Sequence, residues 1–324
     1  MTDQEPRSEA PRLGDQLPRR RLGRSELNVP AFAMGGYPLG VEQPDEDEAI
    51  ATVQYAVDQG IDYLDTSPMY GDSERRIGLA LEGYDREKLV ISTKTGSHPQ
   101  RRGDYSYDGT MWSVENSLKL LKTDYLDLVL VHDVNVLHPE QLKPVLAPHG
   151  ALDALEALKA QGVIRAIGLG QRDFEIHRQA IETDRFDVIL TFNNYHPLDT
   201  SAADWLLPLA EAHDVGVLNG AVMAHGLLTG EDPDEIVARR AFAESVTRLL
   251  PAARKLYAFC RRWEVPMAAV LFQFSMRQPL IDCTLCGPKS RAEMAENLHA
   301  ATMALPEELW AELAALDLPS IVEA

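Results

Sequence analysis

The 324-residue sequence predicts an α/β fold, a (β/α)8 TIM barrel, on two observations. Short apolar runs recur roughly every 30 residues, and several are nearly continuous in Val, Ile and Leu, which is typical of parallel strands buried on both faces. Helical patterns fill the intervals between these runs. Strands that alternate with helices over this length favour a barrel, and no G-x-G-x-x-G follows the first run, which disfavours a doubly wound open sheet.

We predict eight strands in chain order. Their runs are VPAFAMGG (29–36), IDYLDT (61–66), LVISTK (89–94), LDLVLVHD (126–133), IRAIGLG (164–170), FDVILTFNN (186–194), VGVLNGAVM (215–223) and LIDCTLCG (280–287).

The first intervening helix, residues 45–60, has acids in its first turn, apolar residues spaced by three and four, and Gly60 as its stop signal. Similar patterns cover residues 72–83, 110–122, 150–162, 200–213 and 264–278. Two stretches exceed the eight-unit repeat. Residues 235–263 predict extra helix between the seventh strand and the helix that follows it, and residues 306–316 predict a C-terminal helix.

The chain is expected to form a polar, disordered lead-in at residues 1–18 and a single domain at residues 19–324. The N-terminus has no apolar core typical of a secretory signal, and the basic run Arg19, Arg20 and Arg21, where the lead-in meets the domain, is interpreted as a solvated charged continuation of the lead-in. No apolar run approaches the roughly 20 residues that span a bilayer.

A net charge of -19 argues against nucleic acid or an anionic membrane as partner. Three cysteines, an odd number, fit a reducing compartment, and we expect a cytoplasmic protein. Cys283 and Cys286 form one C-x-x-C inside an apolar run. No second ligand pair has suitable spacing, so we expect no metal site. Oligomeric state is not indicated.

The candidate catalytic residues follow from the barrel, because the C-terminal ends of its strands surround the active site. Asp65, Lys94 and His132 close three successive runs, and Tyr70 follows Asp65 in the next loop. An Asp or His at a strand end is commonly structural. A lysine ending an apolar run, however, is costly to bury unless paired, and Asp65 is the obvious partner.

These four side chains suit proton transfer. A phenol ordinarily titrates near ~10, and a nearby ammonium is expected to pull the pKa of Tyr70 toward neutral. Tyr70 would then exchange a proton with a substrate oxygen that His132 orients, while Asp65 keeps Lys94 charged. Such a set offers no obvious nucleophile, so it favours hydride transfer with an external cofactor.

The segment GIDYLDTSPMYGDSERRIGLAL (60–81), together with Asp65, Tyr70, Lys94 and His132, resembles the aldo-keto reductase superfamily over nearly the whole chain. The resemblance implies a (β/α)8 barrel that binds NAD(P)(H), with Tyr70 as general acid/base and His132 as substrate orienter. Three further stretches (19–40, 162–170 and 201–230) resemble NAD-linked sugar dehydrogenases of the aldose 1-dehydrogenase type. Expected alternatives are an aldehyde or ketone reductase and a pyridoxal dehydrogenase.

The resemblance also implies the cofactor contacts. They are Gly36, Asp65, Gln171, Phe192, Gly220, Ala221, Gly287, Lys289, Glu293, Glu296 and Asn297. Gln171 is expected at the nicotinamide carboxamide. Gly220 stands where relatives carry an aromatic stacking residue, so Phe192 or Tyr195 is the candidate substitute. Glu293 stands where NADP-preferring relatives have an arginine, and its carboxylate would repel a 2′-phosphate, so NAD is expected over NADP.

The substrate is expected to be a small polar molecule held by loops after the strands. Candidate contacts are Tyr37, Met69, Trp112, His132, His196 and His225, and the long loop 133–150 is expected to shape or cover the site.

Two other functions stay open. Lys94 could form a Schiff base as in aldolases, although pairing with Asp65 would keep it protonated and poorly nucleophilic. Alternatively, the altered nicotinamide contacts fit a non-catalytic binding protein that senses the cofactor.

Overall fold

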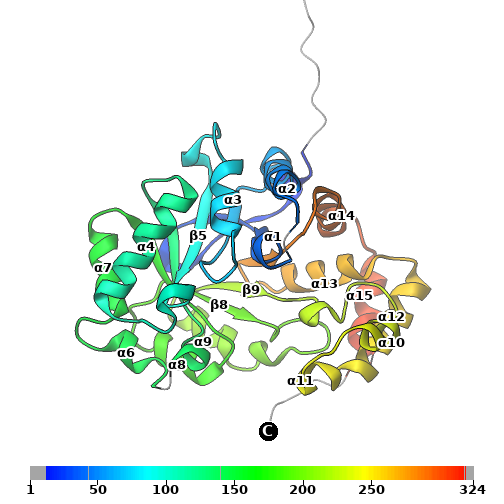
Figure 1. Ribbon diagram of the computed structural model, residues 1–324. Helices are drawn as coiled ribbons and strands as arrows, with labels where there is room; N and C mark the ends of the chain where they lie inside the picture. Colours follow the sequence, from blue (N-terminus) through cyan, green and yellow to red (C-terminus); the bar gives the residue numbers. More distant parts are fainter. Residues whose placement is uncertain (1–11, 43, 139, 317, 319–324) are drawn as a thin grey trace, which may run out of the picture.

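The structure is a computed structural model that describes residues 12–42, 44–138, 140–316 and 318. Among these residues, eight parallel strands close into a barrel (Figure 1). In neighbouring order they are β3 (Phe32–Gly35), β4 (Tyr63–Asp65), β5 (Val90–Thr95), β6 (Leu126–His132), β7 (Ile164–Gly170), β8 (Val188–Phe192), β9 (Gly216–Gly220) and β10 (Cys283–Cys286). β10 pairs with β3, with Cys286 opposite Met34. The predicted barrel is confirmed.

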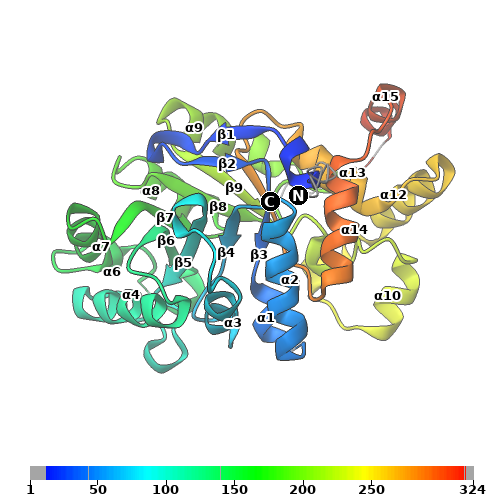
Figure 2. The ribbon, with the colours of Figure 1, turned by 90° about the horizontal axis from the view of Figure 1, so that it is seen from above.

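Helices surround the barrel (Figures 1 and 2). The main ones are α2 (Glu46–Asp58), α3 (Ser73–Ala80), α4 (Tyr107–Leu121), α7 (Ala151–Ala160), α8 (Phe174–Ile181), α9 (Leu206–Ala212), α13 (Met267–Met276) and α14 (Arg291–Thr302). The predicted extra helices are α10 (Pro233–Arg239), α11 (Glu244–Thr247) and α12 (Leu250–Trp263) after β9, and α15 (Glu307–Ala315) near the C-terminus. Shorter turns of helix are α1 (Tyr37–Val41), α5 (Val134–Leu137) and α6 (Lys143–Leu146).

Local signals account for the helix boundaries. Asp45 caps α2 by accepting a hydrogen bond from the Asp47 amide, and Gly60, in the left-handed region at φ 91°, follows its end. Helix α8 is absent from the sequence-based prediction. It begins at the cap Asp173, which accepts from the Ile176 amide, and its buried face includes Ile176, Ala180 and Ile181. Spacings of four and one residues fit one side of a helix.

An antiparallel hairpin, β1 (Arg19–Arg21) with β2 (Asn28–Pro30), lies across the N-terminal end of the barrel (Figure 2). Its Leu22, Leu27 and Val29 belong to the apolar cluster that fills the barrel. Gly23, at φ 50°, approaches β9 so closely that a Cβ would lie 2.0 Å from the Gly216 nitrogen. The prediction of a single strand over residues 29–36 is therefore wrong. This run is divided between the hairpin strand β2 and the barrel strand β3.

The interpretation of Arg19–Arg21 as part of a lead-in is wrong, because this segment is strand β1, although Arg19 and Arg21 are exposed to solvent as expected. Arg19 pairs with Asp62 at 2.7 Å and Arg21 with Asp214 at 2.5 Å. The half-buried guanidinium of Arg20 donates to three backbone carbonyls of the turn between α13 and β10, those of Met276, Gln278 and Ile281. The basic run thus ties the hairpin to the barrel.

The predicted lead-in falls partly outside the described residues, which begin at residue 12. Leu13–Gln16 form one turn of 3-10 helix, and the Gly14 amide donates to the Gln59 carbonyl at 2.8 Å. Leu17 is buried. The disorder predicted for residues 12–18 is therefore not observed. The single domain over residues 19–324 stays a prediction. Among the described residues, none of the helices combines the length and apolar character that crossing a bilayer requires.

Arg20→Ala is expected to destabilise the fold by about 2 kcal/mol, because three carbonyls lose a charged donor in a partly buried setting. Urea denaturation followed by circular dichroism measures the change. Lys119→Ala is the control. It removes an exposed pair with Glu115 and should cost less than about 0.5 kcal/mol. Equal stability of the two variants would show that the hairpin does not depend on Arg20.

Candidate active site

Three adjacent strands deliver three predicted catalytic residues to the C-terminal end of the barrel. Asp65 is the last residue of β4, Lys94 the penultimate residue of β5 and His132 the last residue of β6. These strands are neighbours in the sheet. Tyr70 lies in the loop between β4 and α3. The structure therefore brings together the four residues that the sequence predicts.

Lys94 and Asp65 form a buried ion pair. The Lys94 ammonium donates to Asp65 Oδ2 at 2.7 Å and to the Thr66 carbonyl at 2.7 Å, and Ser92 donates to Asp65 Oδ1 at 2.7 Å. The exposed fractions of Lys94 and Asp65 are 1% and 3%. Burial acts to lower the pKa of Lys94, but its interactions with Asp65 and Tyr70 outweigh burial and raise that pKa. Lys94 is thus a fixed cation and a poor Schiff-base nucleophile.

Tyr70 lies beside this cation. The Lys94 nitrogen is 4.9 Å from the centroid of the Tyr70 ring, and the His132 ring meets the Tyr70 ring edge-on at 6.1 Å. Burial raises the pKa of Tyr70, and the Lys94 charge opposes the rise without cancelling it. The expectation that Lys94 would bring this pKa toward neutral is therefore wrong for the free protein. The desolvation of the phenolate destabilises it by more than the Lys94 ammonium stabilises it, so Tyr70 is protonated at neutral pH.

His132 is held as a neutral imidazole. Burial and then the Lys94 charge lower its pKa well below the ordinary range. Its Nδ1 lies 3.0 Å from the Ser97 hydroxyl and 3.3 Å from the Ser67 hydroxyl. The hydroxyl of Tyr105 donates to its backbone carbonyl at 2.5 Å. These contacts fix the ring beside Tyr70, where a neutral imidazole can hydrogen-bond a substrate oxygen without taking its proton.

Two buried amides fit the nicotinamide group that the family resemblance implies. Gln171 Oε1 accepts from the amides of Arg172 and Asp173 at 2.7 and 3.3 Å, while its Nε2 is buried without a partner. Asn193 Oδ1, just after β8, is also buried without a partner. One free donor and one free acceptor at the ends of neighbouring strands complement a carboxamide. Asn193 is missing from the prediction, although the polar pair after FDVILTF was its signal.

Phe192 and Gly220 are paired across β8 and β9, and a Cβ on Gly220 would lie 3.4 Å from that of Phe192. Phe192 is half-buried on the apolar cluster inside the barrel, and Ala221 is in the left-handed region at φ 55°. A Cβ on Gly220 would thus be in ordinary contact with Phe192, Leu190 and Thr191. Phe192 fits the role of a stacking surface for a planar group.

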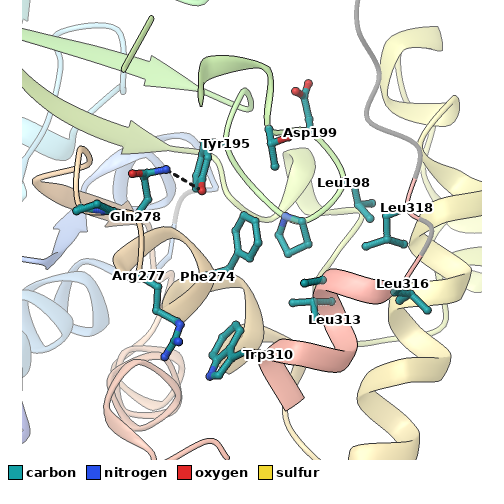
Figure 3. A pocket seen from close by; sticks show the side chains of 14 residues that line it. Tyr195, Leu198, Asp199, Phe274, Arg277, Gln278, Trp310, Leu313, Leu316 and Leu318 are labelled. Atoms are coloured by element: carbon teal, nitrogen blue, oxygen red, sulfur yellow. Dashed lines mark hydrogen bonds between the residues drawn. The ribbon is translucent and has the colours of Figure 1, made fainter. Parts of the chain in front are cut away.

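Tyr195 does not share that position. Its ring stacks on Phe274 with centroids 5.3 Å apart, and its hydroxyl accepts from Gln278 at 3.2 Å (Figure 3). These three side chains line a pocket of about 500 Å³ beside α13 and α15. None of the four predicted catalytic residues lines this pocket. Of the two candidate substitutes for the stacking residue, only Phe192 packs on the barrel interior.

The segment after β10 holds the other predicted cofactor residues. Glu293 accepts from the Lys289 amide at 2.9 Å, and Ser290 accepts from the Glu293 amide at 3.1 Å, as in a capping box. Glu296 is exposed, whereas Asn297 is buried and donates to Cys286 Sγ at 3.3 Å. Glu293 therefore has a structural role in starting α14, and its contact with a cofactor stays a prediction.

Two predicted glycines lie where strands leave the barrel. Gly36 donates to the Asp65 carbonyl at 2.7 Å, and a Cβ there would lie 2.4 Å from the Ser73 hydroxyl. A Cβ on Gly287 would lie 2.6 Å from Pro38. Both are therefore required by close packing around the site, and their contact with a cofactor stays a prediction.

The predicted substrate residues are dispersed. Tyr37 is 51% exposed and meets the Tyr70 ring at 5.2 Å, and Met69 precedes Tyr70 in the same loop. Trp112 instead packs edge-on against His98 at 4.6 Å.

The predicted histidines lie farther along the barrel rim. His196 is fully buried, with Nδ1 accepting from the Leu198 amide, and His225 lies in the loop after β9 at φ 55°. Only Tyr37, Met69 and His132 are thus placed beside Tyr70. Substrate contacts for the rest stay a prediction. The loop 133–150 contains α5 and α6, and its cover over the site is likewise a prediction.

Cys283 and Cys286 lie buried on β10, and all three cysteines are free. No group of three or more His, Cys, Asp or Glu side chains placed to hold a metal occurs within the part of the chain that the structure describes.

Comparisons with known proteins agree with this geometry. The model of the aldo/keto reductase family matches residues 31–318. Among curated relatives, D-threo-aldose 1-dehydrogenase of a Pseudomonas species is 30% identical, over 89% of this chain and 94% of that protein. Pyridoxal 4-dehydrogenase of Microbacterium luteolum is 30% identical, over 91% of this chain and 96% of that protein. L-galactose dehydrogenase of Arabidopsis thaliana is 30% identical, over 92% of this chain and 93% of that protein.

Solved structures show the same likeness. A putative aldo-keto reductase from Pseudomonas aeruginosa has a TM-score of 0.63 at 29% identity and covers 88% of this chain and 94% of its own. An aldo-keto reductase from Bacillus halodurans, in its holo form, has a TM-score of 0.69 over 95% and 99%. Its 23% identity supports the fold alone.

Asp65→Asn is expected to cost about 3–5 kcal/mol of unfolding free energy, because it leaves the Lys94 ammonium buried without its counter-charge. The double variant Asp65→Asn with Lys94→Met should recover part of that loss, since the unpaired charge is gone. Denaturant unfolding of both single variants and the double variant completes the cycle. Additive losses would mean that the two side chains do not stabilise each other.

Proposed function

The chain belongs to the aldo/keto reductase family and is an NAD(P)-dependent oxidoreductase, and we propose that it is a sugar dehydrogenase in which Tyr70 is the general acid/base. The observation that carries the proposal is the Lys94 ammonium, fixed by Asp65 at 2.7 Å and lying 4.9 Å from the Tyr70 ring centroid. A permanent cation at this point stabilises the phenolate formed when Tyr70 gives up its proton.

Each of the proposed site residues then has one role. Tyr70, protonated at neutral pH, donates its proton to the substrate oxygen in reduction and receives it back in oxidation. The neutral His132 ring orients that oxygen. Gln171 Nε2 and Asn193 Oδ1 would hold the cofactor's carboxamide, with Phe192 against its ring. When bound, NAD(P) would supply the hydride donor or acceptor.

A sugar is the proposed substrate because two relatives act, by name, on aldoses. They are D-threo-aldose 1-dehydrogenase and L-galactose dehydrogenase. A pyridoxal dehydrogenase and a reductase of simple aldehydes or ketones are the alternatives, the first after another relative's name. The test is NAD(P)H absorbance with aldoses, simple aldehydes and pyridoxal, using each cofactor. Turnover of pyridoxal or of simple carbonyls in preference to every aldose would reject the sugar assignment.

We also propose NAD as the preferred cofactor and the cytoplasm as the location. The carboxylate of Glu293, beside the Lys289 amide at the start of α14, supports the first point, since it would repel a 2′-phosphate. The free, buried state of all three cysteines supports the second, because it fits a reducing compartment.

Tyr70→Phe is expected to lower kcat on the order of 10²–10⁴-fold, the usual weight of general acid/base catalysis, with cofactor affinity retained. Steady-state kinetics and NADH fluorescence titration measure the two quantities. Tyr84→Phe is the control, since that hydroxyl contacts Asp58 outside the site and its loss should leave kcat unchanged. Near-normal turnover by Tyr70→Phe would remove the proton-transfer role.

Glu293→Gln is expected to raise the ratio of kcat/KM for NADP to that for NAD about tenfold, a change of about 1.4 kcal/mol. Glutamine keeps an acceptor for the Lys289 amide but loses the charge that repels a 2′-phosphate. The control is Glu115→Gln on the outer face of α4, which should leave the ratio unchanged. An unaltered ratio in Glu293→Gln would exclude Glu293 as the basis of selectivity.

A further inference from the structure

Asp133 directly follows the catalytic strand β6 and has an unusual backbone. It is in the left-handed region at φ 45° and ψ 45°, immediately before α5. Its amide donates to the Gly170 carbonyl at 2.9 Å, which ties this turn to the neighbouring strand β7. Residues other than glycine in this region are uncommon and concentrate at functional sites, although Asp tolerates it better than most.

The ordinary role of an Asp at this position is absent. Asp133 is the cap residue of α5, but its side chain accepts no hydrogen bond from the helix. By contrast, Asp173 caps α8 and Asp232 caps α10 through their carboxylates. Helix capping therefore does not account for Asp133.

The carboxylate of Asp133 faces the catalytic residues instead. Its Oδ2 lies 3.4 Å from His132 Nε2, and its Oδ1 is buried with no hydrogen-bond partner. Its negative charge contributes to the raised pKa values of Tyr70 and Tyr105, while Lys94 partly stabilises it. This places the carboxylate beside the point between Tyr70 and His132 where the substrate oxygen must sit.

A buried carboxylate oxygen without a donor is costly, so a donor from outside the chain would be favourable. The Lys94 ammonium is already engaged with Asp65 and the Thr66 carbonyl, and His132 Nε2 lies 3.4 Å from Oδ2, so Oδ1 is the oxygen left without a donor. A hydroxyl on the carbon next to the reacting carbon is a donor that a substrate bound at Tyr70 and His132 would bring to this part of the site. Burial raises the pKa of Asp133 to about 6, so the carboxyl is largely ionised at neutral pH and can accept a hydrogen bond from a hydroxyl.

We propose that Asp133 is a substrate-binding residue that accepts a hydrogen bond from a hydroxyl group on the carbon next to the reacting carbon. It makes the enzyme selective for α-hydroxy carbonyl compounds and for the aldoses that contain this unit. This inference rests on the proposed function, since it assigns a substrate class to the same site.

The test compares matched substrates that differ only in that hydroxyl. One pair is glycolaldehyde and acetaldehyde in reduction, and the other is an aldose and its 2-deoxy analogue in oxidation. The wild type should favour the hydroxyl-bearing member of each pair about 10- to 100-fold in kcat/KM, the range expected for a hydrogen bond to a charged group. In Asp133→Ala, kcat/KM for the hydroxyl-bearing member should fall by that factor, while kcat/KM for the other member should change less than about threefold.

Asp133→Asn provides a second variant of the same size in case the alanine variant fails to fold. Its kcat/KM should fall at least about threefold more for the hydroxyl-bearing substrate than for the paired substrate, because an amide oxygen is a weaker acceptor than a carboxylate. Asp232→Ala is the control, an Asp that caps a helix outside the site. It should lower the melting temperature slightly and leave both values of kcat/KM unchanged.

The outcomes separate this inference from the proposed function. Equal losses on both members of a pair would mean that Asp133 acts through His132, and would overturn the inference while leaving the dehydrogenase intact. A wild type with equal kcat/KM for the paired substrates would also overturn the inference and leave the proposed function intact. A wild type that binds NADH but turns over no substrate of either kind would reject both the function and the inference.

Discussion

The buried ion pair between Lys94 and Asp65 is the interaction on which the catalytic site depends. Two charges taken out of water are costly unless they meet at close range with their remaining hydrogen bonds satisfied. The pairing of β4 with β5 provides that geometry, and Ser92 and the Thr66 carbonyl complete the hydrogen bonds. Burial is the main reason that His132 is neutral, and the Lys94 charge adds to it, while the same charge gives the Tyr70 phenolate, when formed, a counter-charge.

The two ends of the barrel serve different purposes. At the N-terminal end the hairpin closes the interior with apolar side chains, and Arg20 satisfies backbone carbonyls. At the C-terminal end several polar atoms are buried without partners, including those of Gln171, Asn193 and Asp133. Residues in the left-handed region follow β6, β8 and β9 at the same end. Strain and unsatisfied groups of this kind lower stability, and ligands that complement them recover the cost.

The position of the missing aromatic residue is next to an aromatic residue of the neighbouring strand. Gly220 has no side chain, and its partner across the sheet is Phe192, which is half-buried against the apolar cluster inside the barrel. Tyr195 belongs to a separate pocket beside α13 and α15. Phe192 is therefore the better placed of the two predicted substitutes, and its contact with a cofactor stays a prediction.

The sequence by itself determined the barrel and brought together the four residues that we predict to be catalytic. Buried parallel strands leave long apolar runs, and three successive runs that each end in a titratable residue place those residues at one end of a barrel. The tertiary structure alone decided that burial outweighs Lys94 in the pKa of Tyr70 and that Arg19–Arg21 form a strand. It also revealed that Asn193 and Asp133 each bury one side-chain oxygen that has no hydrogen-bond partner. Desolvation and hydrogen-bond satisfaction depend on atoms distant in sequence, so no local pattern records them.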